Sequence, residues 1–264
     1  RYSMPPWILE QWLAWDTPGQ VGQMLRNFLE EKPTSIRCNL HQISREDLKR
    51  KLAGEGVKAE EVPELPCALL ISGYDYLGAL PSFQEGDFQV QDISSMLVAE
   101  RANPREGDYI IDVCAAPGGK ALHLADKLRG TGMVQARDIS DYKVGLIWDN
   151  IRRAGMENIE AVRWDATVLD GESVEKADIV IADLPCSGLG VLGRKSDLKY
   201  RMTREGEKEL AALQRQILSQ VWRYVKPGGK LVYSTCTINR EENEENAAWF
   251  QAEYPEFRLV SEEQ

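Results

Sequence analysis

The stretch Asp112-Val-Cys-Ala-Ala-Pro-Gly-Gly-Lys120 decides the fold, because it joins a short apolar run to the start of a helical pattern. The run Tyr109–Val113 is typical of a buried strand, and the segment around Lys120–Leu128 is typical of a helix. Paired glycines let a backbone approach a ligand closely, and a helix N-terminus favours a negative group. Neither a phosphate-binding loop nor a complete dinucleotide fingerprint is present. We therefore expect a different ligand here, and an ordinary tight turn is the alternative.

Outward from this stretch, short apolar runs alternate with helical segments. We expect further strands over 133–136, 159–162, 179–182 and 230–235, a last strand near 257–260, and helices over about 140–154, 204–225 and 241–253. Pro227-Gly-Gly229 is expected to end the longest helix. Strands that alternate with helices predict an α/β fold with a doubly wound, mainly parallel sheet.

The first hundred residues show a different pattern. Aromatic side chains near the N-terminus predict amphipathic helices, and two apolar runs and a capping pattern predict strands and a further helix. The residues concerned are Trp7, Trp12, Trp15 and Phe28 for the first helices, 35–40 and 67–71 for the strands, and Ser44 to Ala53 for the capped helix. We expect a smaller N-terminal α+β module over 1–100 and a main domain over 101–264.

Composition excludes several classes of protein. The chain has 264 residues, 43% of them apolar and 28% charged, which is ordinary for a globular protein. No apolar run approaches the ~20 residues that span a membrane, and residues 1–20 lack a signal-peptide pattern. Five scattered cysteines without a C-x-x-C pair, and only two histidines, argue against a disulfide framework and a zinc site. We expect a cytoplasmic, metal-free monomer.

The net charge of −10 is unevenly distributed. Residues 241–264 carry a net −7, whereas residues 91–240 carry +1. The segment Gly193–Arg204 holds five positive charges and one negative. This segment favours a polyanionic partner, and its candidate contacts are Arg194, Lys195, Lys199 and Arg201. A solvated surface is the alternative.

Acidic residues follow the expected strands at the edge where open α/β sheets bind ligands. They are Asp112, Asp138, Asp165 and Asp183. Carboxylates in such a row suit a ligand with hydroxyls, an amino group and an ammonium group. S-adenosylmethionine has all three and no phosphate. A single aspartate at such a position is more often a helix cap.

Two cysteines also lie at expected strand ends. Cys186 closes Asp183-Leu-Pro-Cys186, and Cys236 closes Tyr233-Ser-Thr-Cys236. Thiols at these positions predict covalent catalysis in which a second thiol assists. The alternative is that each is a small buried apolar residue.

Together these motifs resemble the RsmB/Sun family of RNA cytosine-5 methyltransferases. The resemblance rests on 112–120, 183–190, Asp197-Leu-Lys199 with Arg201, 233–236 with Glu242-Asn243, and 91–95. Within the family, the resemblance is strongest to the branch that modifies small-subunit ribosomal RNA, with tRNA as the alternative substrate. The chain departs from the family at Ala121 and Ser196, and it lacks the additional N-terminal helical domain. We therefore expect either a fragment or reduced affinity for RNA. The resemblance also implies that the N-terminal module over 1–100 binds RNA.

The resemblance implies a role for each site residue. The methionine part of the cofactor would contact the loop Cys114, Ala115, Ala116, Pro117, Gly118, Gly119 and Lys120, with Asp138 at the ribose and Asp165 at the adenine. Asp183 would lie between the cofactor and the cytosine, with Lys120 as a second polar contact. Cys236 would attack C6 of the base, and Cys186 would assist release.

Three competing functions remain open. A DNA cytosine-5 methyltransferase uses a Pro-Cys nucleophile, but that function leaves Cys236 unexplained and needs a large target-recognition region. A ribosome-assembly factor that binds RNA without methylating it leaves both thiols unexplained. A redox dithiol is disfavoured because the cysteines are far apart in sequence.

Overall fold

A computed structural model describes residues 2–262 of the chain. The described residues form two compact units, each assembled from separate segments. One unit comprises 33–183 and 220–233, and the other comprises the described residues of 1–32, 184–219 and 234–264. The expected division of the chain at residue 100 stays a prediction, because units of packing need not coincide with domains.

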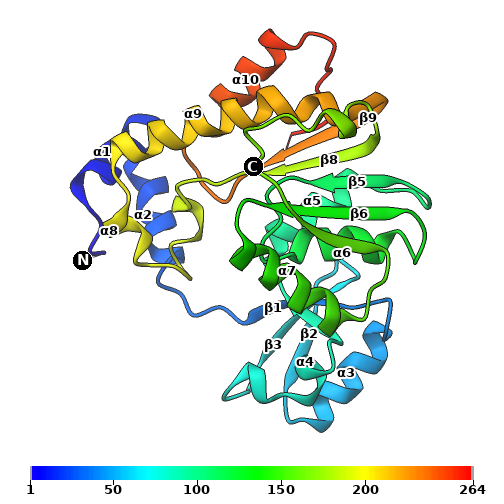
Figure 1. Cartoon of the computed structure of the whole chain (residues 1–264). Helices are drawn as coiled ribbons and strands as arrows, with labels where there is room; N and C mark the ends of the chain where they lie inside the picture. The colour runs from blue at the N-terminus through cyan, green and yellow to red at the C-terminus, as the bar shows by residue number, and fades with distance from the viewer. Residues whose placement is uncertain (1, 263–264) are drawn as a thin grey trace. The chain divides into compact units, whose positions relative to one another are not determined.

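The first unit contains a five-stranded sheet in the order β7-β6-β5-β8-β9 (Figure 1). Its elements are β5 (Tyr109–Asp112), α6 (Gly119–Lys127), β6 (Met133–Asp138), α7 (Asp141–Ala154), β7 (Ile159–Arg163), η2 (Gly171–Ser173), β8 (Ala177–Asp183), η4 (Trp222–Tyr224) and β9 (Val225–Ser234). β5 pairs in parallel with β6 and β8, and β6 pairs in parallel with β7. The expected parallel α/β sheet is confirmed.

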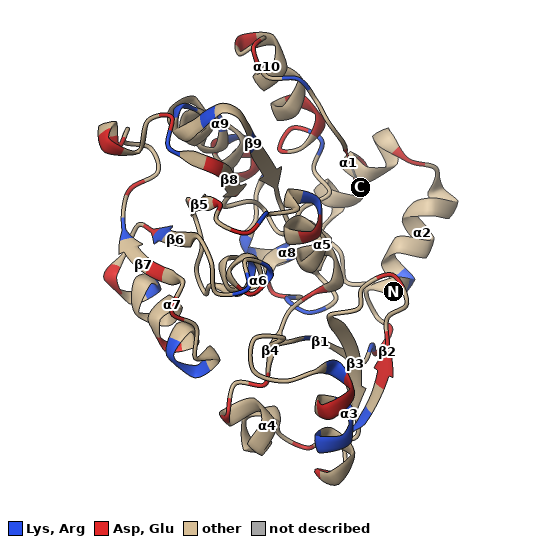
Figure 2. Ribbon diagram, turned by 90° about the vertical axis from the view of Figure 1, so that its right-hand side faces the viewer, with Lys and Arg blue, Asp and Glu red and all other residues tan. Residues whose placement is uncertain are grey.

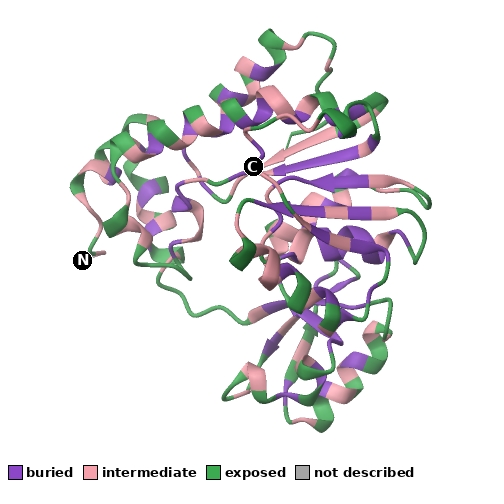
Figure 3. Ribbon diagram, viewed as in Figure 1, coloured by how far each residue is buried: buried purple, intermediate pink, exposed green. Residues whose placement is uncertain are grey.

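The central strands of this sheet are buried, which explains their apolar sequences. Ile110, Val134 and Ile181 are fully or almost fully excluded from solvent, and Figure 3 shows β5 and β8 largely buried along their lengths. Strands covered on both faces read as continuous apolar runs, so the sequence located them well. The chain adds β6 and β7 on one side of β5 and then crosses to β8 on the other. The carboxyl end of β5 is therefore the point where an open α/β sheet binds its ligand.

The same unit holds a four-stranded antiparallel sheet in the order β2-β3-β1-β4. Its elements are β1 (Thr34–Cys38), α3 (Arg45–Gly54), β2 (Lys58–Glu61), β3 (Ala68–Ser72), η1 (Leu77–Ala79), α4 (Pro81–Gln84), β4 (Phe88–Val90) and α5 (Ile93–Ala102). Ser44 caps α3 as its sequence predicts, since its side chain accepts a hydrogen bond from the Asp47 backbone. The expected α+β module is confirmed. Buried Arg37 of β1 is paired with Asp126 of α6 at 3.2 Å, which ties the two sheets together.

The second unit is mainly helical. Its elements are α1 (Pro6–Trp15), α2 (Pro18–Asn27), η3 (Leu189–Val191), α8 (Leu198–Arg201), α9 (Arg204–Val221, whose last two residues belong to the first unit) and α10 (Glu244–Glu253). The aromatic cluster predicted near the N-terminus forms, with the rings of Trp12 and Phe28 6.2 Å apart. Leu189 and Leu192 complete this core. The N-terminal helices therefore support the segment that follows Cys186.

Two expectations about the C-terminal third are wrong. Residues 257–260 form no strand. Phe257 instead packs its ring on Phe250 at 5.4 Å, while Leu259 and Val260 are exposed. The longest helix ends at Val221, so Pro227-Gly-Gly229 lies within β9 and does not end the helix.

No helix among residues 2–262 combines the length and the apolar character needed to cross a membrane.

Candidate active site

The loop after β5 is held by hydrogen bonds to the end of β6. The Ala115 backbone donates to the carbonyl of Arg137 at 2.8 Å, and the Ala116 backbone donates to Asp138 Oδ2 at 3.0 Å. Gly118 caps α6 with φ of 108°, a left-handed conformation that strains any other residue. A Cβ there would also lie 3.4 Å from Ile147. The glycine therefore lets α6 begin directly at the loop, against α7.

Three charged side chains lie at this edge of the sheet. Lys120 Nζ donates to Asp183 Oδ2 at 2.6 Å. Lys120 lies in the first turn of α6, and Asp183 is the last residue of β8. The Asp112 carboxyl beside them is buried, and its pKa is raised to about 7 by desolvation and by the charge of Asp183. Asp112 Oδ2 has no hydrogen-bond partner among the described residues. A buried carboxyl oxygen left in this way fits a ligand that brings a donor, such as an ammonium group.

The other loop and strand-end residues are placed as follows. Asp138 is buried and accepts hydrogen bonds from the backbone N–H groups of Ala116 and Ile139. It also forms an ion pair with Lys143 at 3.0 Å. Asp165 instead accepts from the backbone and hydroxyl of Thr167 in its own turn, which lowers its pKa. Burial raises the pKa of the Cys114 thiol, so it remains protonated. The structure thus joins Asp138 to the loop, whereas the hydrogen bonds of Asp165 are local.

In the second unit, two thiols from distant parts of the sequence meet. Cys186 Sγ and Cys236 Sγ are 3.2 Å apart, and the Cys236 backbone donates to Cys186 Sγ at 3.3 Å. Cys236 is exposed and Cys186 is half-buried. The pKa of Cys186 is raised, first by its hydrogen bond with Cys236 and then by burial. Cys186 therefore keeps its proton and can donate it to the sulfur of Cys236.

A buried carboxylate joins the two cysteine-bearing loops. Glu242 is fully buried and accepts hydrogen bonds from the Ser187 backbone and the Gln214 side chain, both at 2.9 Å. Its role was missed by the sequence analysis, which used Glu242 only as part of a motif. The available signal was Gln214 itself, a polar residue in the apolar stripe of α9 that includes Leu210 and Ile217.

The basic segment after Cys186 is largely exposed, as expected for a surface that meets a polyanion. Arg194, Lys195 and Arg201 are exposed, and Lys199 is half-buried with its ammonium 5.1 Å from the Tyr200 ring. Arg201 forms an ion pair with Asp197 at 3.2 Å. Lys199 and Arg201 belong to α8, and Figure 2 colours lysine and arginine blue. Their contacts with RNA stay a prediction.

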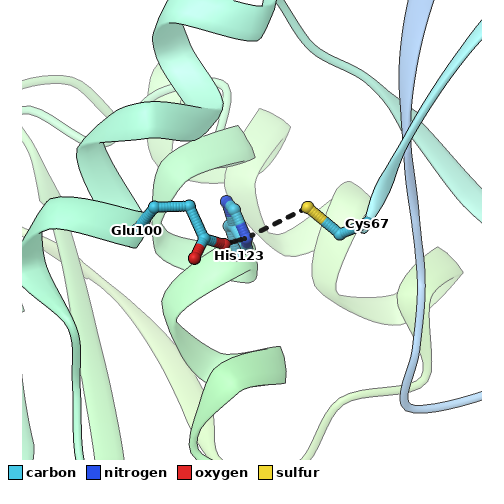
Figure 4. Close-up of side chains that lie close together, drawn as sticks. All are labelled: Cys67, Glu100 and His123. Atoms are coloured by element: carbon cyan, nitrogen blue, oxygen red, sulfur yellow. Dashed lines mark hydrogen bonds and ion pairs between the residues drawn. The ribbon is translucent and has the colours of Figure 1, made fainter. Parts of the chain in front are cut away.

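Cys67, Glu100 and His123 form a separate cluster in the first unit (Figure 4). Their ligand atoms lie within 4.8 Å of one another, a spacing that a metal ion could bridge. However, His123 Nε2 contacts Glu100 at 3.2 Å, and Lys127 binds the other oxygen of Glu100 at 2.6 Å. The carboxylate is therefore already shared by two donors, and the charges of Lys127 and Arg37 oppose a further cation. We assign no metal to this cluster, and the absence of a metal stays a prediction.

The cluster predicts a pH dependence of stability. Burial lowers the pKa of His123 to about 4, against an ordinary 6.5, although Glu100 opposes the shift. Between pH 6.5 and 4, His123 is therefore protonated in the unfolded chain and neutral in the native state. This histidine should cost roughly 3 kcal/mol of unfolding free energy as the pH falls through that window.

The pKa values of Asp112 and Glu207 are instead raised, both to about 7. These two carboxyls therefore increase the free energy of unfolding as the pH falls through the same range. The contribution of His123 must therefore be measured as the difference in unfolding free energy between the wild type and a His123 variant. We expect His123→Gln, which keeps a donor for Glu100, to lose less stability than the wild type between about pH 7 and about pH 4.5 in urea unfolding. Equal losses in the two proteins would contradict the assignment.

The parallel sheet, the glycine-bearing loop and the strand-end carboxylates define a Rossmann-like, S-adenosylmethionine-dependent methyltransferase domain. The particular family follows from comparison with known proteins. The family model of the 16S rRNA methyltransferases RsmB/F matches residues 99–264, and the model of their ferredoxin-like domain matches residues 4–74. The chain belongs to the RsmB/F family. The family resemblance seen in the sequence is thereby confirmed.

Individual relatives agree with this placement. The chain is 36% identical to a probable ribosomal RNA small subunit methyltransferase B of Bacillus subtilis, over 97% of the chain and 57% of that relative. The crystal structure of PH0851 superposes with a TM-score of 0.95 at 31% identity, covering 99% of the chain and 59% of that protein. The crystal structure of NSun6 from Pyrococcus horikoshii with SFG superposes with a TM-score of 0.87 at 25% identity, covering 94% of the chain and 87% of that protein. The chain spans about 57–60% of the length of the curated methyltransferase B relatives.

Proposed function

We propose that this chain transfers a methyl group from S-adenosylmethionine to C5 of a cytosine in small-subunit ribosomal RNA. The observation that carries the proposal is the pair of thiols, Cys186 and Cys236, with their sulfurs 3.2 Å apart. C5 of cytosine is too weak a nucleophile to take a methyl group directly, so a covalent step that activates the ring is chemically required. A nucleophile with an adjacent thiol that holds a proton suits this step.

In the proposed mechanism, the thiolate of Cys236 adds to C6 of the base. The new C6–S bond turns the ring into an enamine, and the electron pair at C5 attacks the methyl group. The proton on C5 then passes to a base, its electron pair restores the C5–C6 double bond, and the C6–S bond breaks to regenerate the thiolate. We assign the release step to Cys186, whose raised pKa keeps a proton near the departing sulfur.

The cofactor supplies the electrophilic methyl group when it is bound. The residues that would hold it are those of the loop 114–120, with Asp138 at the ribose hydroxyls and Asp165 at the adenine. The partnerless oxygen of Asp112 supports a positively charged ligand group at this site. Asp183 would accept a hydrogen bond from N3 of the cytosine once that nitrogen is protonated in the adduct, and Lys120, whose ammonium lies 2.6 Å from Asp183, would fix the orientation of the carboxylate. Arg194, Lys195, Lys199 and Arg201 would contact the RNA backbone.

A cytosine stacked inside a duplex cannot present C6 to a thiol, so we propose a loop or single-stranded site in the RNA. Small-subunit ribosomal RNA is favoured over tRNA because the matching family model and the curated methyltransferase relatives carry that description. The protein would act as a monomer in the cytoplasm, where ribosomes are assembled.

The test is methyl transfer to purified RNA by the chain alone. We expect transfer from labelled S-adenosylmethionine to deproteinised small-subunit ribosomal RNA, and a new bisulfite-resistant cytosine at one position. Purified tRNA and duplex DNA serve as matched substrates that should stay unlabelled. Binding of cofactor and RNA without any transfer would favour an assembly factor instead, and labelled DNA would favour the DNA enzyme.

A further inference from the structure

The thiol pair is bracketed by a buried hydrogen-bond network that no part of the covalent chemistry uses. Gln214 Nε2 donates to the carbonyl of Pro185 at 2.8 Å and to Glu242 at 2.9 Å. Glu242 also accepts from the backbone N–H of Ser187 at 2.9 Å. Pro185 and Ser187 are the two neighbours of Cys186. One carboxylate and one amide therefore fix the backbone on both sides of the Cys186 thiol.

The same carboxylate reaches the loop of the other thiol. The hydroxyl of Ser187 bonds Glu242 Oε1 and lies 2.6 Å from the hydroxyl of Thr237, the residue after Cys236. Asn239 Nδ2 also donates to Glu242 Oε1, at 3.3 Å. Glu242, Ser187 and Asn239 are all essentially excluded from solvent. The carboxylate thus collects donors from both cysteine loops and from α9.

We propose that Glu242, together with Gln214, is a positioning residue that sets the separation and orientation of the Cys186 and Cys236 sulfurs. A carboxylate suits this position because both of its oxygens accept, and the Ser187, Gln214 and Asn239 groups that reach it donate. Removing it takes an acceptor away from the buried Ser187 N–H, Gln214 amide and Asn239 amide, which loosens both loops. The inference deepens the proposed function and rests on it for the effect on methyl transfer, but its geometric part does not need that function.

The separation of the thiols can be measured without any methylation. Glutathione disulfide oxidises the pair in two exchange steps: two S–H bonds are lost, one S–S bond forms between Cys186 and Cys236, and two molecules of reduced glutathione are released. The equilibrium constant of this reaction reports how well the fold holds the sulfurs together. We expect Glu242→Ala to lower it by roughly tenfold or more, the scale of a lost hydrogen bond to a charged group. Tenfold corresponds to about 30 mV for this two-electron couple.

Glu242→Gln is the second variant, and it guards against a failure of the alanine variant to fold. Its amide keeps the shape and one acceptor but presents a donor to Ser187 or Asn239, so its constant should lie between those of wild type and Glu242→Ala. Glu207→Gln is the matched control. Glu207 is another buried glutamate of this unit, and its carboxyl accepts a hydrogen bond from Gln11 at 3.1 Å. The charge of Glu242 reaches it, but among the described residues it forms no hydrogen bond with either cysteine loop, so its replacement should leave the constant almost unchanged.

The kinetic readout is a split between kcat and KM. Both Glu242 variants should lower kcat in the same order as the thiol constant, with KM for RNA and for S-adenosylmethionine changed less than about twofold. A folded Glu242→Gln protein with a wild-type thiol constant would overturn the proposal. If wild-type protein methylates no RNA while the variants still shift the constant, then the proposed function fails and the positioning role stands.

Discussion

Replacing Cys236 by alanine should abolish methyl transfer, with a loss of roughly 10⁴-fold or more, the scale seen when a covalent nucleophile is removed. Without the sulfur, no bond forms to C6, and C5 keeps its low nucleophilicity. The measurement is the initial rate of methyl transfer from labelled S-adenosylmethionine. Cofactor affinity should stay within about twofold of wild type, because the loop 112–120 belongs to the other packing unit.

The covalent step itself is visible with RNA that carries 5-fluorocytosine at the target position. Fluorine replaces the C5 proton whose removal would release the sulfur, and it cannot itself be removed as a cation, so the adduct with the wild-type enzyme persists in denaturing gels. The Cys236→Ala protein should form none. Cys38→Ala removes a buried thiol in another part of the chain and should leave the adduct intact. A stable adduct on Cys236→Ala protein would show that a different residue attacks.

The sequence allowed the parallel sheet to be predicted because its strands are buried on both faces. Continuous apolar runs such as Ile179–Ala182 mark β8, whereas β2, which reads Lys58-Ala-Glu-Glu61, carries no apolar pattern and was missed. The strand expected at 257–260 failed for the opposite reason. Its residues favour strands intrinsically, but they find no sheet partner there, and Phe257 joins an aromatic cluster instead.

The candidate site divides in the same way. Chemistry-bearing residues at strand ends, such as Asp183 and Cys186, were recognisable because the carboxyl edge of a parallel sheet is where ligands bind. The residues that hold Cys186 were not recognised, because Ser187 acts through a long-range hydrogen bond that leaves no local spacing, and Gln214 stood out only as a polar residue in the apolar stripe of α9. Asp165 also lies at a strand end, but its carboxylate accepts a hydrogen bond from the Thr167 hydroxyl two residues away. A strand-end position alone therefore does not show whether a carboxylate is held by its own turn or by a distant part of the chain.

Replacing Cys186 by alanine should have a different result: the enzyme should remain trapped on RNA that carries ordinary cytosine instead of 5-fluorocytosine. Addition of Cys236 to C6 needs no second thiol, so the adduct still forms. Release is slow because the proton that Cys186 holds beside the other sulfur, 3.2 Å away, is missing when the C6–S bond must break. We expect a slowly resolving RNA–protein species in denaturing gels and a turnover rate lowered by roughly 10²–10⁴-fold, the range for a general acid–base group.

The double variant decides between this order of events and the reverse. If Cys236 attacks and Cys186 releases, then Cys186→Ala together with Cys236→Ala should form no trapped species, since the attacking sulfur is gone. Free and fully active Cys186→Ala enzyme would exclude the release role. Trapping by Cys236→Ala instead would exchange the two roles and place the nucleophile in the Pro-Cys motif. The hydrogen bond that raises the Cys186 pKa favours the first order, because the thiol that keeps its proton is the poorer nucleophile.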